Sequence, residues 1–385
     1  MYNKSKITAG KLLKVVLLIF GLTLGACSTG YNEDTSSDRR QTNMVVRFTL
    51  PESASASEKS RAGDGYEDGS LIENYIDVQN SCKVLFFSQS NTFLGMLDRQ
   101  VVAEIPGTGR RQYNLCGIPP LNLPSDFKIM IAANWPDTSV IDNAITGSTT
   151  IDDICHAMAT VFDTLPGFML DLENGHLMPF FGIRSYSGIS ILPGTTTLPE
   201  SITLLRAMAK VEIIFDGGAS ELPPAVTLCH FNAKGYCAPY GVYDQNDYGQ
   251  GNDWDSDYLH RLHLVTADNN NDPEASGRRA ELSICADGPY RWTAYVPEYR
   301  NLKADGTPAP DEAYIEIKLS SQAPDEKPFK IYFSTYSGET SANTTLPRFN
   351  IERNNIYRFN VSLHHGQITI FTRPWNYRPQ PEINA

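Results

Sequence analysis

Alternating apolar and polar residues, the pattern of half-buried β-strands, recur along most of the chain. In the first case, residues 45–50, Val46, Phe48 and Leu50 share one face, and a proline follows directly. Further apolar or alternating runs lie at 83–87, 126–136, 206–215, 314–319, 329–333, 355–363 and 367–371. Glycine, proline, asparagine and aspartate separate these runs, which is typical of antiparallel sandwiches.

The run at 206–215 has the clearest two-faced pattern. Its apolar set is Ala207, Ala209, Val211, Ile213 and Phe215, and its charged set is Arg206, Lys210 and Glu212. Because side chains alternate across a strand, we expect the apolar set to face a core and the charged set to point the other way.

One helix is predicted near residues 149–158, where apolar residues recur at helical spacing after a Ser/Thr region that can cap it. Strands and helices do not alternate along the chain, so a doubly wound fold is excluded. We predict an all-β fold with a minor α component, built from two tandem antiparallel β-sandwich domains of the transthyretin-like type. The domains are expected at 70–199 and 200–385, because the segment 192–203 is rich in proline and threonine.

The N-terminal segment 1–26 has four lysines, no acidic residue and an apolar run from Val15 to Ala26. This run is shorter than the roughly 20 residues of a membrane-spanning helix, but it fits a secretory signal peptide. It ends in Leu-Gly-Ala-Cys at 24–27, which resembles a bacterial lipobox. The resemblance implies that Cys27 is lipidated and becomes the new N-terminus, which anchors the chain to a membrane from outside the cytoplasm.

A polar segment follows the first predicted strand and extends to about Gly69. It is rich in Ser, Ala, Glu, Asp and Gly and carries Lys59 and Arg61. A structureless segment of this length is uncommon inside a compact domain and indicates function or disorder. Residues 27–69 therefore form a unit: a lipidated N-terminal segment with a removable first strand and a flexible tether.

Net charge, hydrophobic content and cysteine spacing limit the functions that the chain can have. The formal net charge is −12, and loss of residues 1–26 changes it to −16, so nucleic acid is not an expected partner. With 41% hydrophobic residues, 17 Phe and 19 Tyr, the chain has enough apolar surface for real cores. Six cysteines remain beyond Cys27. Their spacing is not that of a compact disulfide framework, so we expect mainly buried thiols, with a Cys229–Cys237 bridge as an alternative.

Candidate chemical sites are weak. Asp253, Asp255 and Asp257 resemble part of a calcium loop, but the glycine and the bidentate glutamate of that motif are missing, and a solvated acidic loop fits better. The His364–His365 pair has no third ligand at a telling distance. The sequence contains no nucleophile elbow, phosphate loop or zinc-protease motif. We therefore predict a protein that is not an enzyme and needs no cofactor or metal.

Several stretches together resemble the fimbrillins of Bacteroidales, the type V pilins with their anchor and tip relatives. They are the lipobox, the detachable strand with a downstream arginine, "LRAMAKVEI" (204–212), "AYVPEY" (294–299), "NIERNNIYRFNVSL" (350–363) and "TRPWNYRP" (372–379). The resemblance implies a subunit of a cell-surface fimbrium, lipid-anchored at the outer membrane. It also implies that an arginine-specific protease removes the first strand and that another subunit supplies a replacement strand.

Cleavage between Arg61 and Ala62 is the expected maturation step, because Arg61 follows the first strand, whereas a cut after Arg40 would leave the strand attached. The alternatives are a fimbrial anchor or tip subunit and a surface glycan-binding lipoprotein, with an exported β-sandwich hydrolase last. Aromatic residues of a glycan platform would be Tyr240, Tyr243, Tyr248, Trp254 and Tyr258.

Overall fold

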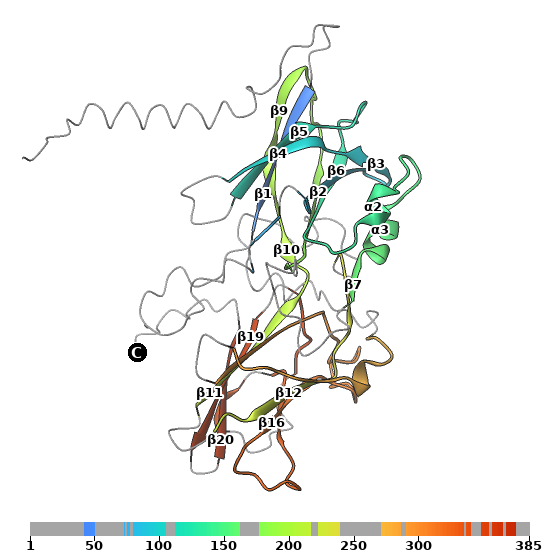
Figure 1. The fold of residues 1–385 in the computed structure, drawn as a ribbon. Coiled ribbons are helices and arrows are strands. Elements are labelled where there is room, and N and C mark those ends of the chain that lie inside the picture. The colour runs from blue at the N-terminus through green and yellow to red at the C-terminus, as the bar shows by residue number, and fades with distance from the viewer. Residues whose placement is uncertain are drawn as a thin grey trace, which may run out of the picture.

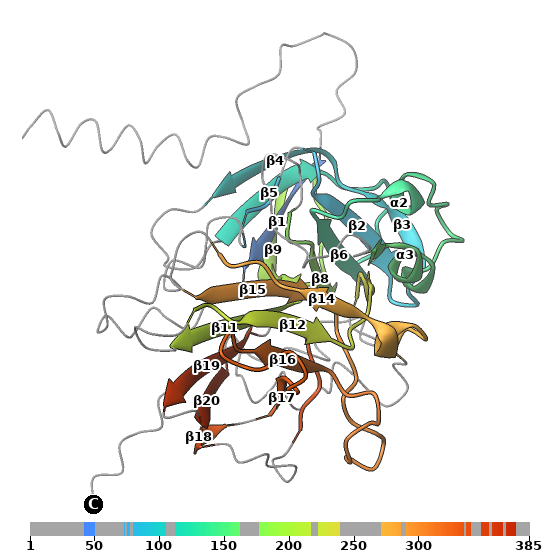
Figure 2. The same cartoon turned by 60° about the horizontal axis from the view of Figure 1, so that its bottom comes forward.

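The computed structural model shows two all-β domains arranged in tandem (Figure 1). It describes residues 42–50, 73, 75–77, 80–104, 112–161, 177–216, 222–238, 271–285, 290–334, 336–339, 348–353, 356–364 and 367–374. The first domain, coloured blue to green, lies above the second, coloured yellow to red, and Figure 2 shows the same order after rotation. The all-β fold class is therefore confirmed.

The first domain consists of two sheets that enclose a core. One sheet has the order β4-β5-β1-β9, with β4 (Asp98–Glu104), β5 (Gln112–Ile118), β1 (Thr42–Thr49) and β9 (Gly194–Thr203). The other has the order β10-β8-β6-β2-β3, with β10 (Leu205–Arg206), β8 (Phe180–Tyr186), β6 (Phe127–Ala133), β2 (Lys83–Ser88) and β3 (Phe93–Met96).

Two short helices lie beside the second of these sheets (Figure 2), α2 (Ser139–Asp142) and α3 (Ile151–Ala157). The predicted helix is α3. It starts with a capping box in which the Thr150 hydroxyl accepts from the Asp153 backbone N–H and the Asp153 carboxylate accepts from the Thr150 N–H. Its buried face packs Ile151, Ile154 and Cys155 against the domain.

The second domain also consists of two sheets. The first has the order β15-β11-β19-β20-β18, with β15 (Arg291–Val296), β11 (Ala209–Asp216), β19 (Ile356–His364), β20 (Gln367–Pro374) and β18 (Ser337–Glu339). The second has the order β14-β12-β16-β17, with β14 (Arg279–Glu281), β12 (Ala225–Cys229), β16 (Tyr314–Lys318) and β17 (Phe329–Tyr332). A 3-10 turn, η3 (Ala275–Gly277), precedes β14.

The two domains share a strand arrangement. In the first domain, β1 lies antiparallel to β5 and parallel to β9. In the second, β11 lies antiparallel to β15 and parallel to β19. The facing sheets match too, because β8-β6-β2-β3 corresponds to β17-β16-β12-β14. β11 is therefore the counterpart of β1.

Two expectations need correction. The segment 192–203 is not a linker between domains, because β9 occupies most of it and pairs with β1, so the chain leaves the first domain between Arg206 and Ala209. In addition, the sheets are not purely antiparallel, since β1–β9 and β11–β19 run parallel. The strands expected at 83–87, 126–136, 206–215, 314–319, 329–333, 355–363 and 367–371 correspond to β2, β6, β11, β16, β17, β19 and β20.

A two-stranded sheet links the domains. Its strands are β7 (Ala159–Val161), which follows α3, and β13 (Lys234–Tyr236), which follows β12. The apolar cluster beneath it takes Ile154 and Leu205 from the first domain and Cys237 from the second. The domains therefore share packed apolar surface as well as the covalent crossing at 206–209.

In the part of the chain that the structure describes, no helix is long and apolar enough to cross a membrane.

Candidate functional site

Strand β1 is an inner strand of its sheet, hydrogen-bonded on both sides. It pairs with β5 from Met44 to Thr49 and with β9 from Thr42 to Thr49. Figure 1 shows β1 between these two strands. Without β1, β5 and β9 would face each other across an empty strand position, and each would expose a row of unpaired backbone groups.

The inward face of β1 is completely covered. Val46 and Phe48 are fully buried, Leu50 is 3% exposed, and all three belong to the core of the first domain. The Phe48 ring stacks on Tyr113 of β5, with the ring centroids 4.8 Å apart. The apolar face predicted from the alternation is therefore confirmed, and each fully buried side chain of this kind contributes roughly 1.5–3 kcal/mol.

Arg47 is a basic residue within β1 whose backbone is paired on both sides. Its side chain is exposed, but its backbone lies opposite Asn114 on one side and Ser201 on the other. The register against β9 shifts between Val45 and Arg47, because β9 contains a bulge there. A protease binds an extended, unpaired segment, so the paired backbone shields the Arg47 peptide bond.

The bulge in β9 leaves an open hollow of about 480 Å³ against β1. Arg47 and Thr49 of β1 line it together with Arg184 of β8 and Glu200 of β9. Arg184 donates to the Ser201 carbonyl at 3.2 Å and forms an ion pair with Glu200. One wall of the hollow belongs to β1.

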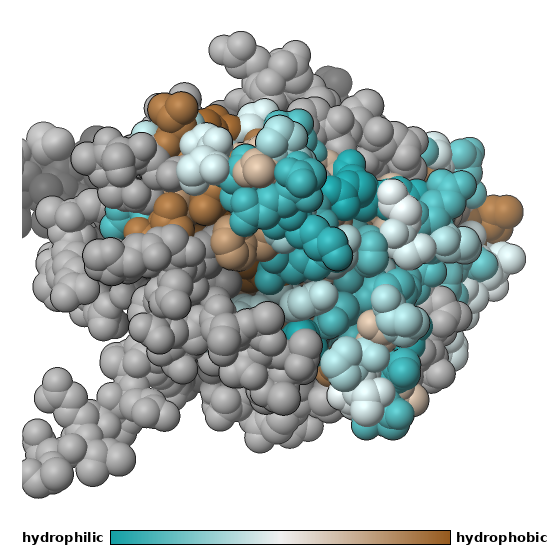
Figure 3. Space-filling view, turned by 90° about the horizontal axis from the view of Figure 1, so that it is seen from below, coloured by the Kyte–Doolittle hydropathy of each residue, from teal (hydrophilic) through white to brown (hydrophobic). Residues whose placement is uncertain are grey.

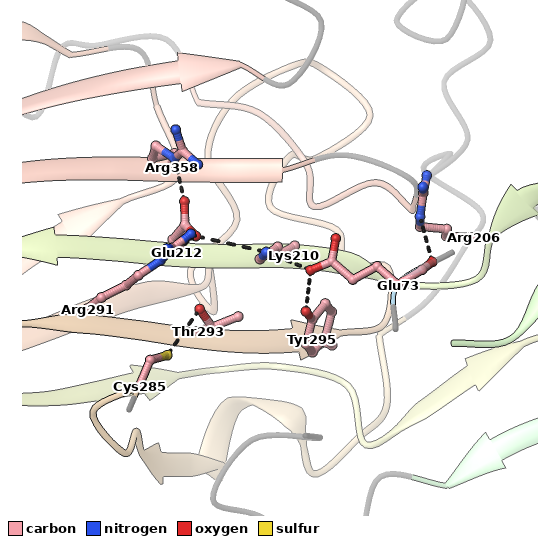
Figure 4. Close-up of polar contacts among 9 residues, drawn as sticks. All are labelled: Glu73, Arg206, Lys210, Glu212, Cys285, Arg291, Thr293, Tyr295 and Arg358. Atoms are coloured by element: carbon pink, nitrogen blue, oxygen red, sulfur yellow. Dashed lines mark hydrogen bonds and ion pairs between the residues drawn. The ribbon is translucent and has the colours of Figure 1, made fainter. Parts of the chain in front are cut away.

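Glu73, the next described residue after Leu50, is buried at the junction of the domains (Figure 4). Its carboxylate lies 2.6 Å from the Lys210 Nζ and accepts the Tyr295 hydroxyl, while Arg206 Nε donates to its backbone carbonyl at 3.3 Å. Burial alone would raise the pKa of Glu73, but the charge of Lys210 and the hydrogen bonds from Lys210 and Tyr295 outweigh it and lower that pKa.

A second carboxylate lies beside this pair on β11. Glu212 is fully buried and forms ion pairs with Arg291 of β15 and Arg358 of β19, and the Lys210 Nζ lies 3.9 Å from its Oε1 atom. Figure 4 shows the carboxylates in line along β11, and nearby the Cys285 thiol lies 3.5 Å from the Thr293 hydroxyl. We call Glu73, Lys210, Glu212, Arg291 and Arg358 the junction cluster.

The burial of the junction cluster was not predicted from the sequence. Alternation separated Lys210 and Glu212 from the apolar face of β11, but it gave no sign that they are buried. They are buried because cations on the neighbouring strands and the segment at Glu73 cover the second face of β11. The one signal for Glu73 was a single acid within the apolar stretch "LIENYI" (71–76).

The junction cluster is suited to holding parts together, because each of its two buried carboxylates is paired with at least one of its three cations. Within the part of the chain that the structure describes, no group of three or more His, Cys, Asp or Glu residues can hold a metal ion. Cys27, Arg40, Arg61, Ala62, the aspartates at 253–257, the aromatic residues at 240–258 and His365 lie outside the described residues.

The described surface gives no sign of a broad apolar docking face on the second domain. Seen from below, the coloured residues in the centre of that face are mainly hydrophilic, and a smaller hydrophobic area lies at the upper left (Figure 3). Of the exposed large apolar residues, Leu222 and Ile284 belong to the second domain, whereas Leu121 and Ile145 belong to the first. The strand position of β1 therefore remains the best candidate for contact with another chain.

Comparisons with known proteins point to one kind of fold. No protein-family model and no curated protein sequence matches the chain. Among solved structures, it resembles the tip fimbrial protein Mfa3 from Porphyromonas gingivalis, with 14% identity, a TM-score of 0.52, and coverage of 86% of this chain and 98% of that one. A fimbrial assembly protein from Parabacteroides distasonis has 14% identity, a TM-score of 0.42, and coverage of 86% and 98%. The fold implied by the fimbrillin resemblance is thus confirmed: the chain has the fold of a fimbrial tip protein.

Proposed function

We propose that this protein is a structural subunit of a cell-surface fimbrium, assembled by strand exchange. It is exported as a lipoprotein and anchored to the outer membrane through Cys27. An arginine-specific protease then cuts between Arg61 and Ala62 and releases β1, and a strand from another fimbrial subunit takes its place. The subunit acts in assembly and adhesion and catalyses no reaction.

The inner position of β1 carries this proposal. β1 is paired on both sides and buries Val46 and Phe48 completely. Its loss would leave a vacancy with an apolar floor and two hydrogen-bonding edges. Such a vacancy binds an extended peptide by β-augmentation.

The position of Glu73 supports a cut at Arg61. Glu73 lies downstream of Arg61 and is held by Lys210, Tyr295 and Arg206. The chain that begins at Ala62 would therefore remain fixed to the domain junction after cleavage. The cut would release the residues upstream of it without loosening those downstream.

The vacancy defines the incoming strand. Such a strand must place apolar residues at alternate positions to fill the sites of Val46, Phe48 and Leu50. In the direction of β1, it would run antiparallel to β5 and parallel to β9. Several buried side chains at roughly 1.5–3 kcal/mol each make re-occupation strongly favourable.

The test is to treat the purified full-length precursor with an arginine-specific protease. We expect Ala62 as the new N-terminus and polymers only after the cut. Arg61→Ala should block both, whereas the matched variant Arg40→Ala should polymerise normally. Polymers from Arg61→Ala, or filaments that retain residues 42–50, would contradict a shaft role and favour the alternative, an anchor or tip subunit that keeps its first strand.

A further inference from the structure

Two cysteines from different domains meet beneath the sheet that links the domains. Cys155 lies on the buried face of α3 and is 4% exposed, and Cys237 follows β13 and is fully buried. Both belong to one apolar cluster with Ile154 and Met158. In the structure both are free thiols.

The backbone around the two cysteines brings them together. In the β7–β13 pair, Tyr236 lies opposite Ala159, so the residue before Cys237 pairs with the strand that α3 leads into. The rings of His156 and Tyr236, which directly adjoin the two cysteines, are in edge-to-face contact at 6.5 Å. The cysteines are therefore neighbours through two independent contacts of adjacent residues.

Arg353 holds the segment of Cys237 in place. Its guanidinium donates to the carbonyls of Cys237 at 2.7 Å and of Tyr236 and Ala238 at 3.0 Å. It is itself fixed by Glu298, with an Nε–Oε1 distance of 2.9 Å. Three consecutive carbonyls bound by one buried cation give Cys237 a defined position opposite α3.

The electrostatic environment of Cys155 also depends on Cys237. Burial raises the pKa of the Cys155 thiol, and the hydrogen bond and charge of Cys237 raise it further. The other cysteines with described neighbours differ: Cys285 contacts Thr293, and the charged neighbours of Cys229 include Glu316 and Arg279. The structure places Cys237 in one apolar cluster with Cys155, and this cluster does not include Cys229, so it favours a Cys155–Cys237 pairing over the Cys229–Cys237 bridge considered from the sequence.

We propose that Cys155 and Cys237 are a modification site at which a disulfide joins the two domains. A thiolate of one cysteine attacks the disulfide of an oxidant of the thiol–disulfide oxidoreductase class or of glutathione disulfide, and forms a mixed disulfide. The second thiolate attacks this mixed disulfide and expels the oxidant's sulfur. The two cysteines lose two protons and two electrons, and the oxidant leaves as two thiols.

The disulfide forms while the chain folds, because the folded state protects both thiols. Burial keeps Cys155 protonated and away from oxidants, and only the thiolate reacts. In the cell the step rests on the proposed export, since an oxidising compartment is needed. The closed loop of about 80 residues spans the domain crossing, so the bond should raise Tm by roughly 5–10 °C.

The experiment refolds the full-length chain from denaturant with reduced and oxidised glutathione, then quenches, alkylates and digests it with trypsin. Trypsin cleaves after Lys234 and so separates Cys229 from Cys237. We expect mass spectrometry to find the Cys155 and Cys237 peptides linked. Alkylation of both cysteines, or a link of either to another cysteine, would overturn the proposal.

Two cysteine variants, and protein recovered from cells, provide the controls. Cys155→Ser should lower Tm to that of the reduced wild type and leave Cys237 alkylated, whereas the matched variant Cys229→Ser should keep both the link and the Tm. The mapping on wild-type protein does not depend on whether a variant folds. A link that forms in vitro supports the site, and protein recovered from cells with free thiols would then overturn the proposed export.

Discussion

The Lys210 Nζ lies 2.6 Å from the Glu73 carboxylate, and this ion pair joins the start of β11 to the segment at Glu73. Their side chains are 9% and 3% exposed, so neither charge has water to replace a lost partner. The pair forms the point at which the segment downstream of the proposed cut meets the second domain.

Lys210→Met should be strongly destabilising, because it leaves Glu73 as a buried, poorly compensated carboxylate. Removal of one partner of a buried ion pair costs about 3–5 kcal/mol. The control is Lys83→Met, whose ion pair with Asp142 is 3.4 Å long and exposed, and which should cost about 0–1 kcal/mol. Chemical denaturation measures both, and equal losses would show that Glu73 does not depend on Lys210.

Loss of the Phe48 ring should weaken the packing of β1 against the core of the first domain. Phe48→Ala removes a fully buried ring that stacks on Tyr113, and should lower the free energy of unfolding by about 3–5 kcal/mol. The neighbouring variant Arg47→Ala changes an exposed side chain and should stay within about 0.5 kcal/mol. If the two variants unfold at the same denaturant concentration, the inward face of β1 does not hold the strand.

Glu352 should make stability depend on pH. Burial and the nearby charge of Glu298 raise the pKa of Glu352 to about 8, so the folded protein binds a proton that the unfolded chain releases above its ordinary pKa of 4.5. This contribution to stability is complete below about pH 4.5 and is lost as the pH rises toward 8.

The measurement is the free energy of unfolding from pH 5 to pH 9 for wild type and Glu352→Gln. Glutamine mimics the neutral carboxyl, so the variant should lose part of the decline, on the order of a few kcal/mol. The exposed Glu274→Gln should follow the wild type. Parallel curves for wild type and Glu352→Gln would mean that Glu352 does not titrate in this window.

Gly182 on β8 lacks a side chain where the segment Thr203–Leu204, at the end of β9, passes close to it. A Cβ atom there would lie 2.6 Å from the Thr203 carbonyl oxygen and 2.6 Å from Leu204 Cδ2. Gly182→Ala should therefore lower stability by about 1–3 kcal/mol through overpacking. Gly277→Ala, where nothing lies within 4 Å of the added Cβ, is the matched control. Thermal melting compares the two, and an unchanged Tm for Gly182→Ala would contradict the close approach.

Cys27→Ala should abolish metabolic labelling with a fatty acid and mislocalise the precursor. The expectation rests on the Leu-Gly-Ala-Cys ending of the apolar run. Cys285→Ala keeps the lipobox intact and should be labelled like the wild type. Undiminished labelling of Cys27→Ala would rule out this cysteine as the lipid attachment site.

Local periodicity predicted the strands well because a strand's two faces are encoded in adjacent residues. The alternation of Val46, Phe48 and Leu50 correctly marked a buried face, and Ser/Thr capping next to Ile151 and Ile154 correctly marked α3. The prolines of 192–203 suggested a linker instead of β9. Pro199 is tolerated because β9 is an edge strand and the residue lies at its bulge.

Contacts between residues that are far apart in the sequence could not be predicted from local periodicity. The parallel pairing of β1 with β9, the burial of Glu212 between Arg291 and Arg358, and the approach of Cys155 to Cys237 all join segments far apart in the chain. Only the folded arrangement brings them together. The sequence therefore identified the inward-facing residues of the candidate site, but it did not identify the strands that lie beside them.

The equivalence of β1 and β11 has a topological consequence. Both strands occupy the same place between an antiparallel and a parallel neighbour. β1, however, is the first of the described strands, while β11 has the strands of the first domain before it and the rest of its own domain after it. The cut proposed after β1 would separate that strand from the strands that follow it, whereas a cut beside β11 would leave that strand joined to the first domain or to the rest of its own domain. We therefore expect the proposed exchange at the place of β1 and not at the matching place of β11.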